Sequence, residues 1–379
     1  MSHFKTIIFL LILFLTLSAC KRRGNEVIYG KSGNGNEYAK YFRVSGQEGQ
    51  IEFDIIDSWS SGKENICRYS ITKAPDDSTE AGKITRIEYP IKRVVCMSTS
   101  HIAYMRALGL ENLIVGVSGK QYISDQKILN SIERGEISDV GYEGSLNYEL
   151  LLRLKPDVVF TYGILGENNV YIDKIKELGI DVIALGDYLE DHPIGKLEYL
   201  KLFGKLFNCS RSADSIYNSV KERYFSLNEV VSNADFRPKV LLNAPWKEVW
   251  YIPGNNNYMS VLIKDAGGDP VLSKDGESKS ISYNLEEVYQ KAMIADFWLN
   301  PNNFSTIDEL KNSNPLFKNI PSLKSGKVYN NTKKETLQGG SDFWEKGVIE
   351  PDVILNDLIN ILHPEICSNR ELIYYKKLN

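Results

Sequence analysis

The chain has 379 residues, 42% apolar and 25% charged, which is typical of a globular protein with room for two or three domains. Its formal net charge of -4 offers no basic surface for a polyanion, so nucleic acid is excluded as a partner. Residues 1–20 begin with His3 and Lys5 and continue as an apolar run from Ile7 to Leu17. This pattern is typical of an export signal, and the run is too short to span a bilayer.

The end of this signal, Leu17-Ser18-Ala19-Cys20, resembles the lipobox of bacterial lipoproteins. The resemblance implies that Cys20 becomes the lipid-modified first residue of the mature chain, whose acyl chains hold the protein at a membrane. Residues 21–37 are rich in Gly, Asn and charge and are typical of a flexible tether. We therefore predict an exported protein with a soluble body in the periplasm, anchored by lipid.

Residues 38–90 contain short strand patterns separated by turn residues. In IEFDIID and ITRIEY, apolar and other side chains alternate, which predicts a small antiparallel sheet with one covered face. We interpret this segment as an accessory β element.

The remaining cysteines have no C-x-x-C spacing, and we expect no disulfide. Cys96 lies in an apolar strand pattern and is predicted to be a small buried side chain.

From residue 91 the pattern changes to strands that alternate with helices, which predicts parallel α/β sheets. Residues 91–190 form a first α/β lobe, with Gly109 and Pro156 ending helices, and residues 236–379 form a second, with a capping box at Thr306 to Glu309. Between them, residues 191–235 are helical in composition, although Gly204 and Asn208-Cys209-Ser210 are possible breaks. A cleft between the lobes is the natural ligand site.

Enzyme motifs are missing from the sequence. Gly30-Lys31-Ser32 fails as a phosphate loop because the preceding Gly24 is one position too far away. There is no G-x-S-x-G, H-E-x-x-H or G-x-G-x-x-G pattern. Only three histidines follow the signal, too few for a typical site that holds a bare transition metal, so we predict no metal site and no cofactor. His192 and His363 are interpreted as capping or surface residues.

His101 follows Ser98-Thr99-Ser100 after a strand and opens a helix, which is where α/β sheets place groups that face a ligand. The competing interpretation is that it caps its own helix. Aromatic side chains are concentrated in PWKEVWYIPGNNNY, residues Pro245 to Tyr258, beside a Pro-Gly turn. These rings either pack under a loop or are exposed to bind a ligand.

KRVVCMSTSHIAYMRALGLENLIVGVSG, DVGYEGSLNYELLLRLKPDVVFTYG and IKELGIDVIALG resemble the first lobe of the metal-chelate binding proteins of ABC importers, the periplasmic family that includes ferric-siderophore, haem and vitamin B12 binders. YIPGNNNYMSVLIKDAGG, LEEVYQKAMIADFWLN and GKVYNN extend the similarity to about Pro364. The ending GSDFWEKGVIEPDVILNDLINILHPE is similar to members from Bacteroidetes-type bacteria. The resemblance implies two Rossmann-like lobes bridged by one long helix, here with a small N-terminal antiparallel β extension.

The resemblance also implies site residues and partners. The partners would be a metal-chelate ligand and an ABC permease in the inner membrane, and the protein would be a monomer without enzymatic activity. An acidic residue on each lobe would dock on the permease, and the best matches are Glu167 and Glu277. The predicted ligand-binding residues are His101, Tyr122, Tyr142, Tyr162, Trp246, Trp250, Tyr251 and Trp344.

Many aromatic rings and few cations favour a bulky, partly apolar chelate over a small anion. Ferric siderophores and corrinoids both fit this description, and His101 is a possible contact for a corrinoid. If Glu248 to Ile252 form a strand, Trp246 and Trp250 point to one side and Tyr251 to the other, so not all three can face the cleft. Trp298 ends an apolar strand and is expected in the core. An exported enzyme or a surface adhesion protein on the same scaffold is the alternative of a different class.

Overall fold

The structure is a computed structural model, and it describes residues 36–47, 50–58, 65–72, 84–163, 170–232, 234–366 and 371–379. The predicted signal, the predicted lipidation site Cys20, the docking candidate Glu167 and Cys367 lie outside the described residues. Within these ranges no helix is long and apolar enough to cross a membrane.

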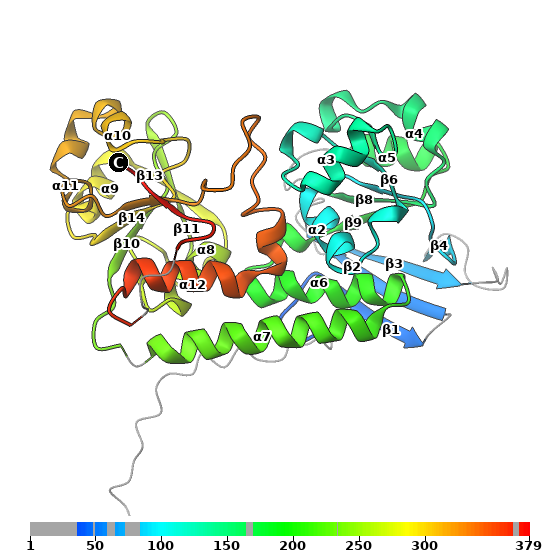
Figure 1. Cartoon of the computed structure of the whole chain (residues 1–379), viewed down its shortest axis with the longest axis horizontal. Helices are drawn as coiled ribbons and strands as arrows, with labels where there is room; N and C mark the ends of the chain where they lie inside the picture. Colours follow the sequence, from blue (N-terminus) through cyan, green and yellow to red (C-terminus); the bar gives the residue numbers. More distant parts are fainter. Residues whose placement is uncertain are drawn as a thin grey trace, which may run out of the picture. The chain divides into compact units, whose positions relative to one another are not determined.

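The accessory β element is a four-stranded sheet in the order β1-β2-β3-β4 (Figure 1). Its alternation is as expected, because Ile51, Phe53 and Ile55 are buried and belong to the large apolar core that includes residues of both lobes. One feature corrects the prediction: β4 runs parallel to β3, so the sheet is mixed rather than antiparallel. The strands are β1 (Phe42–Gln47), β2 (Gln50–Asp57), β3 (Asn65–Thr72) and β4 (Ile84–Glu88).

The first lobe is a five-stranded sheet in the order β7-β6-β5-β8-β9, and every neighbouring pair is parallel. Its strands are short apolar runs, because helices and the accessory sheet cover them. Gly109 and Gly179 adopt positive φ angles just after helices, as the sequence indicated for Gly109. The elements are β5 (Val94–Cys96), α2 (Thr99–Ala107), η1 (Glu111–Leu113), β6 (Ile114–Val117), η2 (Lys120–Tyr122), α3 (Gln126–Glu133), β7 (Ser138–Asp139), η3 (Glu143–Ser145), α4 (Tyr148–Leu154), β8 (Val158–Tyr162), α5 (Val170–Glu177), β9 (Val182–Leu185) and η4 (Asp187–Leu189).

The helical segment between the lobes consists of two helices, α6 (Pro193–Leu206) and α7 (Ser210–Ser232), rather than the one long helix that the resemblance implied. The helical conformation is interrupted at Asn208, which has a φ of 54°. Asn208 is one of the positions where the sequence indicated a possible break in the helix. The two helices pack side by side (Figure 1), and Gly204 permits their close approach, because an added Cβ would lie 2.4 Å from that of Ala213. The 23-residue α7 also packs against α12 (Pro351–Leu362) of the second lobe.

The second lobe has a sheet in the order β12-β10-β14-β15-β16, parallel except for β16, and a separate antiparallel pair, β11 with β13. The predicted capping box is present: Thr306 accepts from the amide of Glu309, whose side chain returns to Thr306. The remaining elements are β10 (Lys239–Leu242), β11 (Val249–Pro253), α8 (Tyr258–Asp265), β12 (Asp269–Pro270), β13 (Ser280–Asn284), α9 (Leu285–Ala292), β14 (Phe297–Leu299), α10 (Ile307–Ser313), η5 (Pro315–Asn319), α11 (Pro321–Lys324), β15 (Val328–Asn330), η6 (Lys346–Ile349) and β16 (Lys376–Lys377).

Two buried carboxylates fasten the segment that leads into the accessory sheet. Glu198 of α6 accepts hydrogen bonds from the amides of residues 37, 38 and 39, at 2.8 to 2.9 Å. Glu190, just before α6, accepts from the amides of Lys40 and Tyr41 at 2.8 to 3.1 Å. Hydrogen bonds to a charged group are stronger than neutral ones. The accessory sheet is therefore tied directly to the helical segment between the lobes.

Candidate functional site

Three of the predicted tyrosines lie at one edge of the first lobe. Tyr122 follows β6, Tyr142 follows β7 and Tyr162 ends β8, and these strands are parallel members of one sheet. Their carboxyl ends therefore share an edge, which is where α/β sheets bind ligands. Tyr122 and Tyr142 are 53% and 48% exposed, so both rings are open to solvent. Tyr162 is partly buried against Tyr188, with ring centroids 6.2 Å apart.

The aromatic run near β11 divides between core and surface. Trp246 precedes the strand and is 65% exposed, while Tyr251, on the strand, is 47% exposed. Tyr251 and Trp250 face opposite sides, as the strand period requires. The prediction that Trp246 points to the same side as Trp250 is wrong: Trp246 is exposed and Trp250 buried, because the backbone turns at Lys247, which has a φ of 57°. Trp246 and Tyr251 are therefore available to a ligand.

The prediction that Trp250 contacts a ligand is wrong in this structure. Its side chain is fully buried, and its ring lies 5.6 Å from that of Trp298 and 5.7 Å from that of Phe317. Its indole N–H donates to the carbonyl of Leu242 at 2.9 Å, so the polar end of the ring is also satisfied. Trp250 is a core residue of the second lobe, as Trp298 was predicted to be.

His101 corrects the sequence interpretation in another way. It lies in the first turn of α2 but is fully buried, and the residue that caps the helix is Ser98. Its Nε2 is 3.6 Å from Oδ1 of the buried Asp187, and its ring meets the edge of Phe160. His101 is thus inside the first lobe, neither a cap nor a ligand-facing group. His192 does cap α6, through Nδ1, but it is buried rather than at the surface.

Lys196 is buried beside an aromatic ring of the second lobe and was not identified from the sequence. The ammonium of Lys196, on α6, sits 4.9 Å from the ring centroid of Tyr258 at the start of α8. Tyr258 in turn contacts the ring of Trp344, which is 45% exposed. Burial lowers the pKa of Lys196, while Asp187 and Glu190 oppose that shift. No sequence signal marks Lys196, because lysines in helices are usually exposed.

Glu345, next to Trp344, is a second residue that the sequence did not single out. Its carboxylate is 2% exposed and contacts the turn after Tyr122 in the first lobe. Burial raises its pKa to about 7, although hydrogen bonds from Ser124 and Asp125 lower it. A raised carboxyl pKa in a buried setting often marks a functional position.

Glu277, the docking candidate of the second lobe, lies in the loop that precedes β13 and is partly exposed. Its carboxylate accepts from the amide of Lys279 at 3.2 Å, and its carbonyl accepts from the amide of Asn256. Glu277 therefore belongs to a loop that packs on the Pro-Gly turn after β11. No distance to Glu167 is defined, because Glu167 lies outside the described residues.

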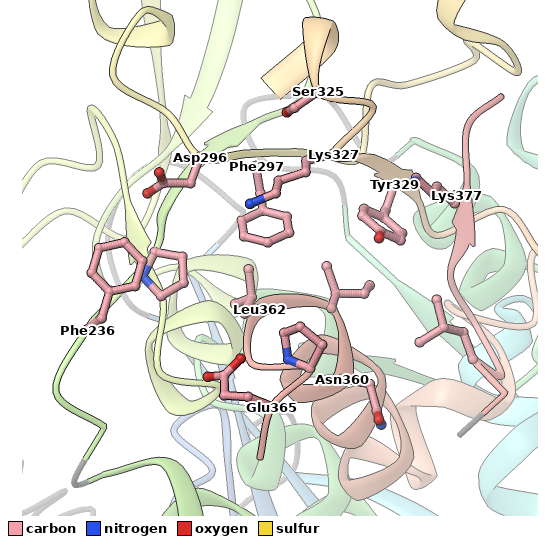
Figure 2. A pocket seen from close by; sticks show the side chains of 14 residues that line it. Phe236, Asp296, Phe297, Ser325, Lys327, Tyr329, Asn360, Leu362, Glu365 and Lys377 are labelled. Carbon is pink, nitrogen blue, oxygen red and sulfur yellow. The ribbon is translucent and has the colours of Figure 1, made fainter. Parts of the chain in front are cut away.

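A cavity of about 590 Å³ lies in the second lobe, away from these residues (Figure 2). Its wall includes Pro238, Asp296 and Lys327, which precede β10, β14 and β15, so it opens at the amino ends of the strands. No predicted site residue lines it. In the described part of the chain, no group of three or more His, Cys, Asp or Glu side chains is placed to hold a metal ion.

Two α/β lobes joined by helices, with exposed aromatic rings at the sheet edges, define a two-lobe solute-binding protein. The chain belongs to the family of periplasmic binding proteins, whose model matches residues 94–335. This confirms the predicted fold class.

This chain is similar to known sequences and to solved structures. Two uncharacterized lipoproteins of Methanocaldococcus jannaschii are similar to it in sequence: one is 29% identical over 303 residues, which are 77% of this chain and 70% of the relative. The other is 27% identical over 335 residues, 84% of this chain and 81% of the relative. A periplasmic heme-binding protein from Pseudomonas aeruginosa matches with a TM-score of 0.57 and 17% identity, over 76% of this chain and 98% of its own. A possible iron-binding periplasmic protein from Staphylococcus epidermidis matches with a TM-score of 0.56 and 18% identity, over 72% and 99%. At such identities the likeness shows the fold alone.

Proposed function

We propose that this protein is the lipid-anchored binding component of an ABC importer, and that it captures an iron-siderophore-type chelate between its two lobes and delivers it to a permease. Family membership supports the binding role. The observation that carries the ligand class is the set of exposed aromatic rings, because flat rings without many cations suit a bulky, partly apolar chelate. These rings are Tyr122, Tyr142, Trp246, Tyr251 and Trp344.

Corrinoid binding in the same role is the second candidate, and stacking on the same rings would serve it. The buried position of His101 removes the reason for expecting that residue to contact a corrinoid. Haem enters as a third probe, because structurally similar proteins include periplasmic heme-binding proteins from Vibrio cholerae and Pseudomonas aeruginosa.

Isothermal titration of the full chain in detergent tests the proposal, with ferric hydroxamate siderophores, ferric catecholate siderophores, cyanocobalamin and haem as ligands. We expect tight one-to-one binding of a ferric siderophore. Preference for cyanocobalamin would select the corrinoid alternative. If none of the four ligand classes binds, the proposal is overturned, and an exported enzyme or a surface adhesion protein is favoured.

Permease docking is proposed for Glu167 and Glu277, one on each lobe. One exposed ion pair contributes little, but two such pairs would fix the orientation of the protein on its partner. Replacing both glutamates with alanine should abolish uptake of the bound chelate by cells and leave its affinity in titration unchanged. Normal uptake by the double variant would reject the docking assignment.

The proposed membrane anchor is the lipid on Cys20. Two related proteins carry the name lipoprotein, which supports this assignment. Replacing Cys20 with serine removes the thiol that carries the acyl chain, so the protein should move from the membrane fraction to the soluble fraction. If the variant stays in the membrane fraction after fractionation, something other than this lipid holds it there.

A further inference from the structure

The segment after β15 belongs to the second lobe in sequence but contacts the first lobe in space. Oε2 of Glu345 accepts from the amide and the hydroxyl of Ser124, at 2.6 and 2.8 Å. Oε1 accepts from the amide of Asp125 at 2.9 Å. Both partners lie in the turn between η2 and α3, more than 200 positions earlier in the sequence. We call these three hydrogen bonds the interlobe contact.

The burial of Glu345 makes its side chain depend on the interlobe contact. A carboxylate removed from water is costly unless hydrogen bonds replace its hydration. All three hydrogen bonds of the Glu345 carboxylate come from the first lobe, and no ion pair neutralises it within the described residues. The nearby carboxylates have cations of their own, because Asp125 pairs with Arg106 and Asp342 with Lys334. Separating this segment from the turn would break all three hydrogen bonds, and water would have to replace them.

The same contact places two candidate ligand residues. Trp344 is the neighbour of Glu345, and Tyr122 precedes the turn that Glu345 holds. The backbones also touch here, since a Cβ added to Gly340 would lie 2.7 Å from the carbonyl oxygen of Tyr122. The helix η6, which follows Glu345, packs against both α2 and α6. The exposed rings of Tyr122 and Trp344 are thus carried by two segments that Glu345 joins.

We propose that Glu345 is a positioning residue: it holds the Tyr122 turn of the first lobe against the Trp344 segment of the second, so that aromatic surface from both lobes is in place before the ligand arrives. This inference rests on the proposed function for the identity of the ligand, but not for the contact itself. A preformed site binds more tightly because less motion is lost on binding. Loss of the interlobe contact should therefore weaken chelate binding without removing any group that touches the chelate.

Hydrogen exchange of the ligand-free, full chain tests the contact. Glu345→Ala removes every acceptor, whereas Glu345→Gln keeps the shape and one acceptor oxygen. Amides of residues 119–125 should exchange at least tenfold faster in Glu345→Ala, with Glu345→Gln between it and the natural protein. The matched control is Glu350→Gln, whose carboxylate contacts Tyr374 and Lys346 within the second lobe. Unchanged exchange in both Glu345 variants would overturn the proposal.

Titration with a ferric siderophore, cyanocobalamin and haem then tests the positioning role. For whichever probe binds the natural protein, we expect Glu345→Ala to lower the affinity about tenfold or more and Glu345→Gln to lower it less. Ser124→Ala should lower the affinity less when it is added to Glu345→Ala than on its own, because the two side chains share a hydrogen bond, although the Ser124 hydroxyl also lies 3.3 Å from Oδ1 of Asp342. Faster exchange with unchanged affinity would overturn the positioning role. If no probe binds the natural protein, the proposed function fails, and the exchange result alone decides whether Glu345 holds the turn.

Discussion

Trp250 and Tyr251 are adjacent in sequence and lie in opposite environments. The strand period sends one side chain into the core of the second lobe and the other to its surface. Sequence reasoning recognised that both could not face a ligand, but it could not tell which one would. The choice depends on Trp298 and Phe317, which surround the indole of Trp250 and come from later elements of the chain.

Replacing Trp250 with alanine should therefore act on stability. We expect a loss of about 3–5 kcal/mol in the free energy of unfolding, because a large buried ring leaves a cavity. Urea denaturation of the variant measures this loss. A change of less than about 0.5 kcal/mol, the size expected at an exposed position, would contradict the buried assignment.

Replacing Trp246 or Tyr251 with alanine should have the opposite profile. Both side chains are largely exposed, so the free energy of unfolding should change by less than about 0.5 kcal/mol. Loss of ring contacts should weaken chelate binding, which titration of each variant measures. Two variants with natural affinity would show that these rings do not touch the ligand.

At the scale of elements, the accessory sheet depends on two carboxyl groups: that of Glu190, just before α6, and that of Glu198, within α6. Glu198 accepts three amides of the segment leading into β1, and the described residues of that segment show no other buried carboxylate bound to these amides. Helix α6, one of the two helices between the lobes, therefore also holds the accessory sheet in place. The sequence marked both elements but gave no sign of their connection, because the glutamate and its partners are about 160 positions apart.

Glu198→Ala should loosen this connection. Removing an acceptor of three charge-assisted hydrogen bonds leaves buried amides unsatisfied, at a cost on the order of 3 kcal/mol. Hydrogen exchange should accelerate in residues 37–47 while the strands of the second lobe keep their protection. Glu222→Ala, at an exposed position on α7, is the control and should change neither. Equal protection of residues 37–47 in Glu198→Ala and the natural protein would contradict the role.

At the scale of the whole molecule, the buried carboxyl groups of Glu190 and Glu345 favour the folded state at lower pH, whereas the lowered pKa of Lys196 acts in the opposite direction. Burial raises the pKa of Glu190 to about 8 and that of Glu345 to about 7, although hydrogen bonds from backbone amides oppose both shifts. The folded state therefore holds more protons than the unfolded chain between about pH 4.5 and 8. Their contribution to stability is complete below the unfolded pKa and is lost as the pH rises through the folded values.

His192 affects stability at lower pH, because burial lowers its pKa to about 3. The unfolded chain binds a proton there that the folded state does not, so stability falls as the pH drops below about 6.5. We therefore expect a higher melting temperature at pH 6.5 than at pH 8.5, with a difference of about 2 kcal/mol in the free energy of unfolding. Glu190→Gln should flatten this dependence. Equal or rising stability toward pH 8.5 would contradict the assignment.

The sequence by itself determined the class of fold, the order of elements and the set of aromatic candidates. Period, glycine stops and capping residues are local, so KVLLNA and the capping box at Thr306 could be interpreted without a partner. Tertiary structure decided that His101 and Trp250 are buried, that β4 is parallel to β3, and that Glu345 meets Ser124. Those features depend on residues far apart in the chain, and the free energy that fixes them comes from burial and from hydrogen bonds that exist only after the lobes have packed.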